Sequence, residues 1–566
     1  MLRNDIFSKE SFMVFRSTLT VTFFFTLLCI GISESAMASW SVWTEPLLID
    51  KPQQTYNPAD KPRSISLKGA KNEWVSFLVC IRGDETLRNF VPSIYLDMQS
   101  GSQTIADKNF VFYLLYNHYV DEQGNTYEPP GHWPDAAVPY RDVYYNEIRD
   151  SSEAGWGQIV PADTTRVFYI ELYIPKEQTA GNYSGTFRLT ANDGALQQDI
   201  AVNLTVWNFE LPEQWSLTNL WGAQLGSWNM DPAAFGVANK EKGKEYNFRL
   251  AQSAVMHGFF PHGGGYGNIG PTDSGSFSHA DFATDQWSWK KFLDGTVPQG
   301  HNPKPYPRTS VYAARAYSGQ AMWYKDTAYM DAWTDFIDNN GYRAHTLIVD
   351  KQYDEPPSLD AINENEAEFH LRHNNKPLRP MEYWTANSHS YPPESEYWDN
   401  PYRQIWTIAQ FYTWYRAHDW GEPYGQPSDF NSRRVQYGDI LWSYTAGDND
   451  SACNIKTYAK SRNIRAAASS SLDAFSRNNA FVFVSDWVFK TSGHHYWMIN
   501  QGWENGNDRW TITDPFGKKY NRDGYNGDGF YFYPGRVSGT SHDIGGSHEI
   551  PIETLRLKLL RWGAQD

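Results

Sequence analysis

Two adjacent carboxyl groups, Asp354 and Glu355, are the residues whose types and spacing best suit catalysis. They lie in the segment Asp350–Pro357, which follows the apolar run His345–Val349 and ends in two prolines. Proline fits neither a helix interior nor a β-ladder, so the chain must leave regular structure here. Hydrolysis of a glycosidic bond commonly uses one protonated carboxyl group that donates to the leaving oxygen, and a carboxylate that stabilises the developing positive charge. Two neighbouring acids can serve both roles because their surroundings can drive their pKa values apart.

The dipeptide alone is not specific, because Asp84-Glu85 and Asp121-Glu122 also occur and are expected to be solvated turns. The pair at Asp354 and Glu355 differs because it comes directly after a predicted strand. In a (β/α)8 barrel the reactive groups lie at the carboxyl ends of the strands. The sequence therefore predicts that Asp354 and Glu355 are catalytic.

Aromatic residues make up 16% of the chain, with 24 Trp, 36 Tyr and 31 Phe. Such rings can pack against the apolar face of a pyranose, while indole N–H groups and hydroxyls bind its hydroxyl groups. Trp442 and Tyr444 alternate along a predicted strand and share one of its faces. Core packing is the alternative for each ring, and it stays open. The predicted substrate-binding residues are His257, Tyr353, Trp384, Trp442, Tyr444, Trp487, Tyr496 and Trp497.

The histidines do not form a metal-binding pattern. His257 and His262 flank Gly258–Pro261, and His494-His495 precede a predicted strand, but neither an HExxH nor a His-x-His set is present. Sugar binding and core packing are both open for each of these histidines. Neither a GxSxG elbow nor a phosphate-binding loop is found, so esterase and kinase functions have no support. We predict no metal and no cofactor.

The chain of 566 residues exceeds the roughly 250–300 residues at which single cores stop growing, so it should contain more than one domain. From residue 39 to 215 it has short alternating runs, such as Val167–Ile174 and Ile200–Val206, that predict a β-sandwich. From 216 to 566, helical stretches such as Lys240–Met256 alternate with short apolar strands. No glycine fingerprint follows the first of these strands, so the pattern favours a (β/α)8 TIM-like barrel over a doubly wound sheet. The predicted fold class is thus multidomain α and β.

Residues 1–38 have the pattern of a secretory signal peptide. Basic residues precede the apolar run Leu19–Ile32, and Ala36–Ala38 supplies small residues for cleavage near Ala38-Ser39. The apolar run is shorter than the roughly 20 residues that span a bilayer. We therefore expect a secreted or periplasmic protein without a membrane span after cleavage.

The formal net charge of −16 opposes binding to phosphate-rich partners, so nucleic acid is not expected as a partner. A carbohydrate, as an oligosaccharide or glycoconjugate, is the predicted substrate. Cys80 and Cys453 would both remain after cleavage of the signal, and their spacing does not decide whether they pair.

Several motifs resemble those of known families through their order and spacing. In the β-rich part they are Gly69–Phe77, Ala180–Gly185 and Phe209–Pro212. In the remainder they are Tyr353–Pro356, Ile440–Tyr444, His495–Trp497, Gly527–Gly535 and Pro551–Arg561. The first set resembles the N-terminal sandwich of glycoside hydrolase family 123 and its relatives, and the second resembles the linked domain of unknown function 4091.

This resemblance implies a retaining, exo-acting glycosidase for β-linked N-acetylhexosamine, with N-acetylgalactosamine favoured. Glu355 would be the acid/base, and Asp354 would orient the substrate's own 2-acetamido group as the nucleophile. An internal nucleophile benefits from the high effective concentration of an intramolecular reaction.

Two other function classes remain open from the sequence. One is a non-catalytic glycan-binding protein on the same scaffold, because a fold does not fix its chemistry. The other is a glycosidase or lyase of different sugar specificity, in which a lyase would use a Tyr or His base. The acidic net charge disfavours a lyase because such enzymes act on polyuronates.

Overall fold

The computed structural model describes the chain in segments. They are residues 39–48, 51–120, 130–213, 218–223, 240–262, 286–287, 290–308, 311–312, 339, 347–349, 405–406, 442–443, 479–480, 483, 493–496, 499–500, 527, 529, 531–535 and 542–565. The predicted signal peptide lies outside these residues. All that follows concerns the compact unit Trp40–Asp566.

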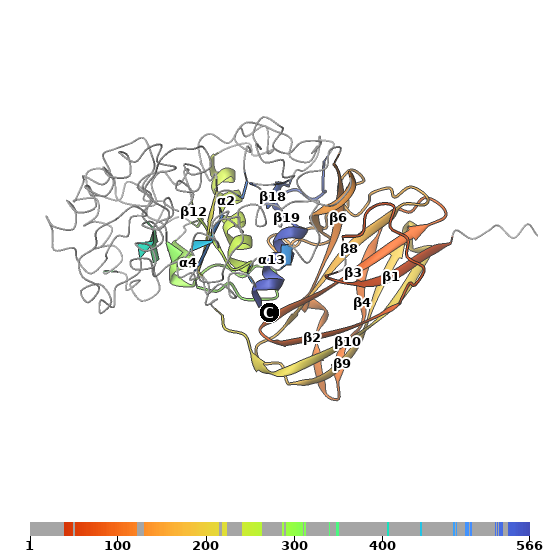
Figure 1. Ribbon diagram of the computed structural model, residues 1–566, viewed down its shortest axis with the longest axis horizontal. Coiled ribbons are helices and arrows are strands. Elements are labelled where there is room, and N and C mark those ends of the chain that lie inside the picture. The colour runs from red at the N-terminus through yellow and green to blue at the C-terminus, as the bar shows by residue number, and fades with distance from the viewer. Residues whose placement is uncertain are drawn as a thin grey trace, which may run out of the picture. The chain divides into compact units, whose positions relative to one another are not determined.

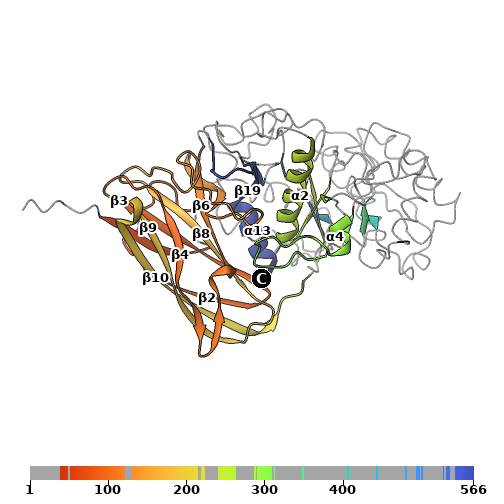
Figure 2. The same ribbon diagram turned by 180° about the vertical axis from the view of Figure 1, so that it is seen from behind.

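Two large β-sheets pack face to face (Figures 1 and 2). The first has seven strands, and every neighbouring pair is antiparallel: β1 (Trp40–Pro46), β3 (Glu73–Gly83), β8 (Thr165–Ile174), β6 (Phe110–Val120), β7 (Gly131–Pro139), β19 (Pro551–Thr554) and β18 (Phe532–Pro534). The second has five strands: β2 (Ser64–Lys71), β10 (Leu196–Glu210), β9 (Gly181–Ala191), β4 (Val91–Ser100) and β5 (Gln103–Ile105). In it only β2 and β10 run parallel.

Strand β8 shows how the sequence forms this core. Phe168, Ile170 and Leu172 point into the cluster between the two sheets, whereas Val167 and Tyr169 belong to a cluster on the opposite face. Successive side chains of a strand point to opposite faces, so a strand covered on both sides must be apolar throughout. All ten residues of β8 are buried accordingly.

Shorter strands form two parallel sheets. One has the order β12 (Phe260–His262), β11 (Thr218–Gly222), β17 (Gly493–Tyr496) and β16 (Trp442–Ser443). The other has the order β13 (Val311–Tyr312), β14 (Leu347–Val349) and β15 (Ile405–Trp406). The described helices are α2 (Lys240–Met256), α4 (Lys290–Asp294) and α13 (Leu555–Gln565), with the 3-10 turns η1 (Asp107–Asn109) and η2 (Asn192–Gly194). None of the helices described is both long and apolar enough to cross a bilayer.

The predicted (β/α)8 TIM-like barrel is wrong. In the described residues the parallel strands form separate sheets of four and three strands, and most of the regular structure is β-sheet with three α-helices. The alternation of strand and helix signals is local, and it does not determine whether strands close into one barrel. In addition, β18 and β19 come from the segment assigned to the barrel, yet they extend the seven-stranded sheet. The domain boundary near residue 215 stays a prediction.

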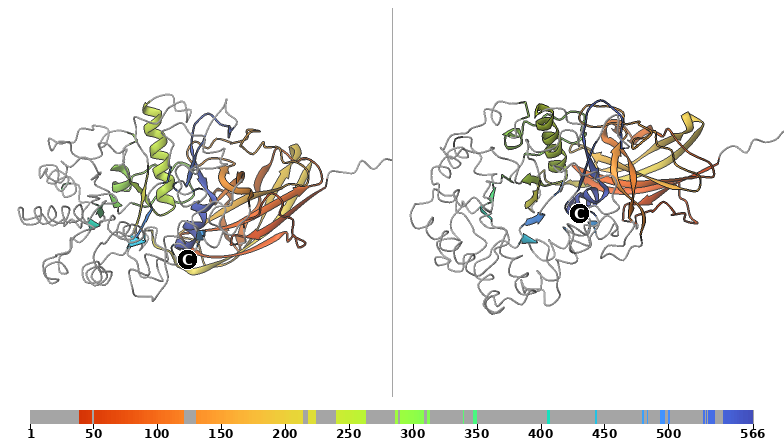
Figure 3. Two further views of the ribbon diagram at one scale, coloured as in Figure 1. Left: turned by 45° about the horizontal axis from the view of Figure 1, so that its top comes forward. Right: turned by 90° about the horizontal axis from the view of Figure 1, so that it is seen from above.

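Helix α13 packs against both the seven-stranded sheet and helix α2 (Figure 3). Leu555 and Leu559 contact the cluster on the sheet, and Leu557 and Leu560 contact the cluster that contains α2. A helix enclosed on several sides has no face on which to expose charge. The three cations of α13, Arg556, Lys558 and Arg561, are buried accordingly.

The Arg556 side chain is fully buried with Asp135 of β7. Its Nη2 lies 2.9 Å from Asp135 Oδ2, and Tyr533 donates a hydrogen bond of 2.8 Å to the same carboxylate oxygen. Burial alone would raise the pKa of Asp135, but the charge and hydrogen bonds of Arg556 hold that pKa below its usual value. The pair therefore stays ionised inside the protein.

We expect Arg556→Met to remove the ion-pair partner of the buried Asp135 and to lower the free energy of unfolding by about 3–5 kcal/mol. Chemical denaturation measures this loss. Lys176→Met is the matched control, because the ion pairs of Lys176 with Glu210 and Glu213 are exposed, and we expect it to change the midpoint little. Equal losses in the two variants would contradict the role given to the buried pair.

Candidate functional site

The predicted site residues are unevenly covered by the structure. His257 is described with its side chain, whereas Trp442 and Tyr496 are described only through the backbone of β16 and β17. The others lie outside the described residues: Asp354, Glu355, Tyr353, Trp384, Tyr444, Trp487 and Trp497.

The strand that precedes the predicted acid pair in the sequence, β14, is described. β14 pairs in parallel with β13 through Val311 and Leu347, and with β15 through Val349 and Trp406. The chain therefore leaves all three strands at the same edge of the sheet. It leaves β14 at Val349 and continues directly into the segment that holds Asp354 and Glu355. Ligands of parallel sheets bind outside this carboxyl edge.

The four-stranded sheet brings two of the predicted aromatic residues onto neighbouring strands. Tyr496 ends β17 and lies beside Trp221 of β11, whereas Trp442 begins β16 and lies beside Gly493. The register offset of three residues places Trp442 and Tyr496 about 10 Å apart along the strand direction. They share a sheet, but they do not sit side by side at its carboxyl edge.

His257 lies between the end of α2 and the start of β12, at the amino end of that strand. His257 is only 2% exposed to solvent. Nδ1 lies 2.8 Å from the carbonyl oxygen of Ser253 and 3.9 Å from Oε1 of Glu553. Burial lowers the pKa of His257 to about 4, against the opposing charge of Glu553, so the ring is neutral at pH 7. These contacts give His257 a packing role, and the predicted sugar contact stays a prediction.

A buried polar cluster that was not predicted from the sequence surrounds His257. Ser253 donates its hydroxyl to Glu553, and Lys558 of α13 forms an ion pair with the same carboxylate. Lys558 also lies 3.2 Å from Oε2 of Glu171 in β8 and donates to the Tyr113 hydroxyl at 3.1 Å. The available sequence signal was the charged residues spaced through the apolar run Pro551–Arg561, because buried charges require partners.

Serine, histidine and glutamate meet in this cluster, but their geometry does not suit nucleophilic catalysis. His257 contacts the backbone carbonyl of Ser253 and not its hydroxyl, and that hydroxyl already donates to Glu553. A catalytic triad needs the imidazole between the hydroxyl and the carboxylate. The cluster therefore joins α2, β19 and α13 and does not have the geometry of a catalytic triad.

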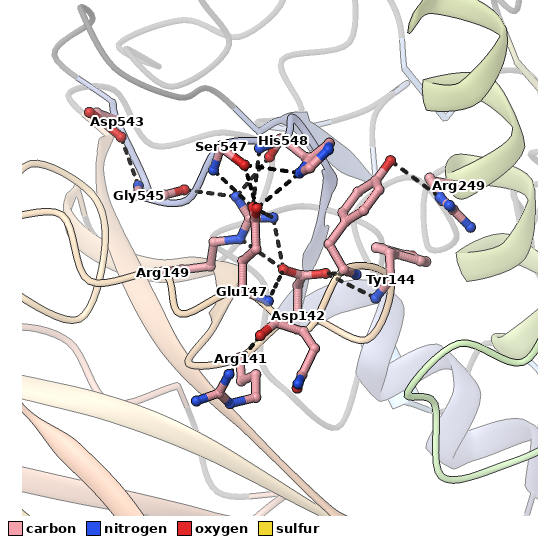
Figure 4. A network of polar contacts seen from close by, with 12 residues as sticks. Arg141, Asp142, Tyr144, Glu147, Arg149, Arg249, Asp543, Gly545, Ser547 and His548 are labelled. Carbon is pink, nitrogen blue, oxygen red and sulfur yellow. Dashed lines mark hydrogen bonds and ion pairs between the residues drawn. The ribbon is translucent and has the colours of Figure 1, made fainter.

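A second network fixes the loop before β19 (Figure 4). Arg149 forms a buried ion pair with Asp142, in which Nη2 of Arg149 lies 2.8 Å from Oδ2 of Asp142. Arg149 also donates hydrogen bonds of 2.7 Å to the carbonyl oxygens of Gly545 and His548. Glu147 accepts bonds from the backbone N–H groups of Ser547 and His548 at 2.8 and 3.1 Å. Burial would raise the pKa of Glu147, but these bonds and those of the two side chains lower it to about 2.

This network also contains a serine, a histidine and a glutamate. The Ser547 hydroxyl and the Glu147 carboxylate both contact the same ring atom, Nδ1 of His548. The ring therefore cannot pass a proton from one to the other through its two nitrogens. Tyr145 stacks on His548 with ring centroids 4.1 Å apart and donates to Glu245 of α2 at 2.6 Å, so the network connects this loop to the helix.

Within the described residues, no three His, Cys, Asp or Glu side chains gather closely enough to hold a metal ion. Cys80 is a buried free thiol in β3, and Cys453 lies outside the described residues. The described polar groups thus hold elements together, and the predicted catalytic acids are not among them.

We expect the buried His257 to make the fold sensitive to acid. Between about pH 6.5 and pH 4 the unfolded chain binds a proton that the folded His257 does not, so stability falls as pH decreases through this window. His257→Gln should remove a slope of at most about 1.4 kcal/mol per pH unit. Denaturation at pH 7, 5.5 and 4.5 measures the slope. His301→Gln, at an exposed position, is the control that should retain the wild-type slope.

No family model and no curated protein matches this sequence. The resemblance to domain of unknown function 4091 thus stays a prediction. Among solved structures, the CooA pilin subunit from enterotoxigenic Escherichia coli covers 30% of this chain and 99% of its own, at 12% identity and a TM-score of 0.14. Such a low score carries no argument about the chain.

A family 123 glycoside hydrolase from Clostridium perfringens, studied for the hydrolysis of glycolipid glycans, is similar over most of both chains. The match covers 93% of this chain and 87% of the other, with 12% sequence identity and a TM-score of 0.53. The N-terminal motifs of the present sequence resemble the same family. This chain therefore shares its fold with a family 123 glycoside hydrolase.

Proposed function

We propose that the chain is a glycoside hydrolase. The observation that carries this proposal is the shared fold with a family 123 glycoside hydrolase over 93% of the chain. It is supported by the position of Asp354 and Glu355, which follow β14 of a parallel sheet in the sequence. The signal-like segment before Ser39 supports export, as a secreted or periplasmic protein.

The proposed substrate is a glycan ending in β-linked N-acetylhexosamine, with N-acetylgalactosamine favoured. The Clostridium perfringens enzyme is described with glycolipid glycans, and we extend this substrate class to the present chain as part of the proposal. Glu355 protonates the leaving oxygen and later activates water. Asp354 holds the 2-acetamido group so that its carbonyl oxygen attacks the anomeric carbon as the glycosidic bond breaks. Water then opens the cyclic intermediate with overall retention.

We expect Glu355→Gln to lower kcat/KM for p-nitrophenyl β-N-acetylgalactosaminide by about 10²–10⁴-fold, because the amide cannot exchange a proton. Thermal unfolding should remain unchanged. Glu85→Gln is the matched control, since it alters the glutamate of another Asp-Glu dipeptide, at an exposed position. Full activity in Glu355→Gln would refute the assignment. Binding of the sugar without hydrolysis by the wild type would favour the glycan-binding alternative.

Asp354→Asn tests the substrate-assisted step separately. We expect the kcat on the acetamido sugar to fall by about 10²-fold, because the side-chain amide of the Asp354→Asn variant no longer orients the 2-acetamido group of the substrate. Wild-type enzyme should hydrolyse the matching 2-hydroxy galactoside poorly. Comparable wild-type rates on the two sugars would instead indicate a nucleophile supplied by the protein, and Asp350 would be tested first.

A further inference from the structure

The outer face of the five-stranded sheet presents rows of small polar side chains to solvent. On β10, Val202, Leu204 and Val206 point into the core, so Asn203 and Thr205 point outward. The strand register then forms two rows across β2, β10 and β9, which lie side by side in Figure 1. The rows are Ser66, Asn203 and Ser184, followed by Lys68, Thr205 and Asn182.

Two aromatic rings continue this face at the end of β10. Trp207 is 40% exposed and Phe209 is 53% exposed. Their centroids lie 5.7 Å apart, with 14° between the ring planes. The register of β10 against β2 shifts after Val206, and the pairing of β10 with β9 also ends at Val206. Both rings therefore lie in the irregular stretch of β10 between the pairs Val206–Gly69 and Glu210–Lys71.

The paired geometry distinguishes these residues from scattered apolar residues, which any surface contains. Burial in the sandwich core would be favourable for either ring because it removes apolar surface from water. Both rings are nevertheless exposed to solvent. The Phe209–Pro212 segment is also one of the motifs found in the sequence. Core packing does not explain Phe209, because its ring is exposed.

The charges of this face indicate the chemistry of a ligand. The chain has 65 acidic and 49 basic residues, but Lys68 is the only formal charge in the two polar rows. Next to the aromatic pair, Glu210 is compensated by Lys176 at 3.1 Å. At the other end of the sheet, Arg188 and Asp199 neutralise each other through bonds of 2.6 and 2.8 Å. The same Lys176 also pairs with Glu213 at 2.9 Å. The two polar rows themselves hold no acidic residue, which on so acidic a protein suits a neutral ligand and does not attract a basic protein.

We propose that this outer face, from Asn203 to Phe209, is a second glycan-binding surface whose occupant is a neutral oligosaccharide. The indole and phenyl rings pack against the apolar faces of the sugar rings. The amide and hydroxyl groups of Asn203, Thr205 and Asn182 bind the sugar hydroxyls, with Thr205 and Asn182 already oriented by a bond of 2.9 Å. This surface holds glycan and carries out no bond cleavage, so it goes beyond the proposed hydrolytic site.

The test compares wild-type protein with the Trp207→Ala/Phe209→Ala double variant on an array of neutral and sialylated glycans at 4 °C. We expect the wild type to bind neutral glycans, and the double variant to bind a subset of them at least about tenfold more weakly. Tyr119→Ala, which removes a 48% exposed ring from the seven-stranded sheet, should bind as the wild type does. Unchanged thermal unfolding will show that the double variant remains folded.

Identical array profiles for the wild type and the double variant would overturn the proposal, as would a wild type that binds no neutral glycan. Selective loss of sialylated glycans would also overturn it, because the ligand would then be anionic. Loss of self-association in the double variant, measured by light scattering without an effect on the array, would identify a protein contact instead. The result does not depend on hydrolysis, so it is independent of the test on Glu355.

Discussion

The buried cations of α13 are the constraint on which the described structure depends. Arg556 pairs with Asp135 of β7, and Lys558 and Arg561 pair with Glu171 of β8. A charge inside protein is tolerated only with a partner, and these carboxylates lie on the seven-stranded sheet. Helix and sheet therefore stabilise each other, although more than 380 residues separate Glu171 from Lys558 in sequence. Because α13 also packs against α2 and Trp221 of β11, the same contact supports the four-stranded parallel sheet.

The elements that the sequence predicted well are those whose signal is local. The run Lys240–Met256 was predicted to be a helix, and α2 has the same bounds. The alternating run Val167–Ile174 lies within β8, and Ile200–Val206 lies within β10. In β10 the buried side chains alternate along the strand, so the period identifies the element, whereas β8 is buried throughout and is identified by its short length and its β-branched and aromatic residues. The His345–Val349 run likewise contains β14, the strand before the predicted acids.

The sequence could not reveal which distant segments pair. Nothing in Pro551–Thr554 indicates that β19 lies beside Ala136 and Ala137 of β7, and with 65 acidic residues the partners of Arg556 and Lys558 cannot be chosen from sequence. The barrel prediction failed for the same reason, because strand closure is a non-local property. His257 was predicted to bind substrate, and that contact stays a prediction. The burial of His257 between α2 and β19 depends on contacts made by residues about 300 positions later, such as Glu553.

The high aromatic content now has a physical explanation in the described region. Phe168, Tyr169 and Tyr173 are at most 3% exposed, so these rings fill the core. A buried tyrosine also requires a partner for its hydroxyl, and Tyr169 and Tyr173 find theirs in Ser76 and Asn72 at 2.8 and 3.1 Å. Tyr169 thus binds the neighbouring strand β3, and Tyr173 binds the turn between β2 and β3, while both rings fill volume. Trp207 and Phe209 do neither: at 40% and 53% exposed they fill no core, and they form the stacked aromatic pair of the proposed glycan-binding surface.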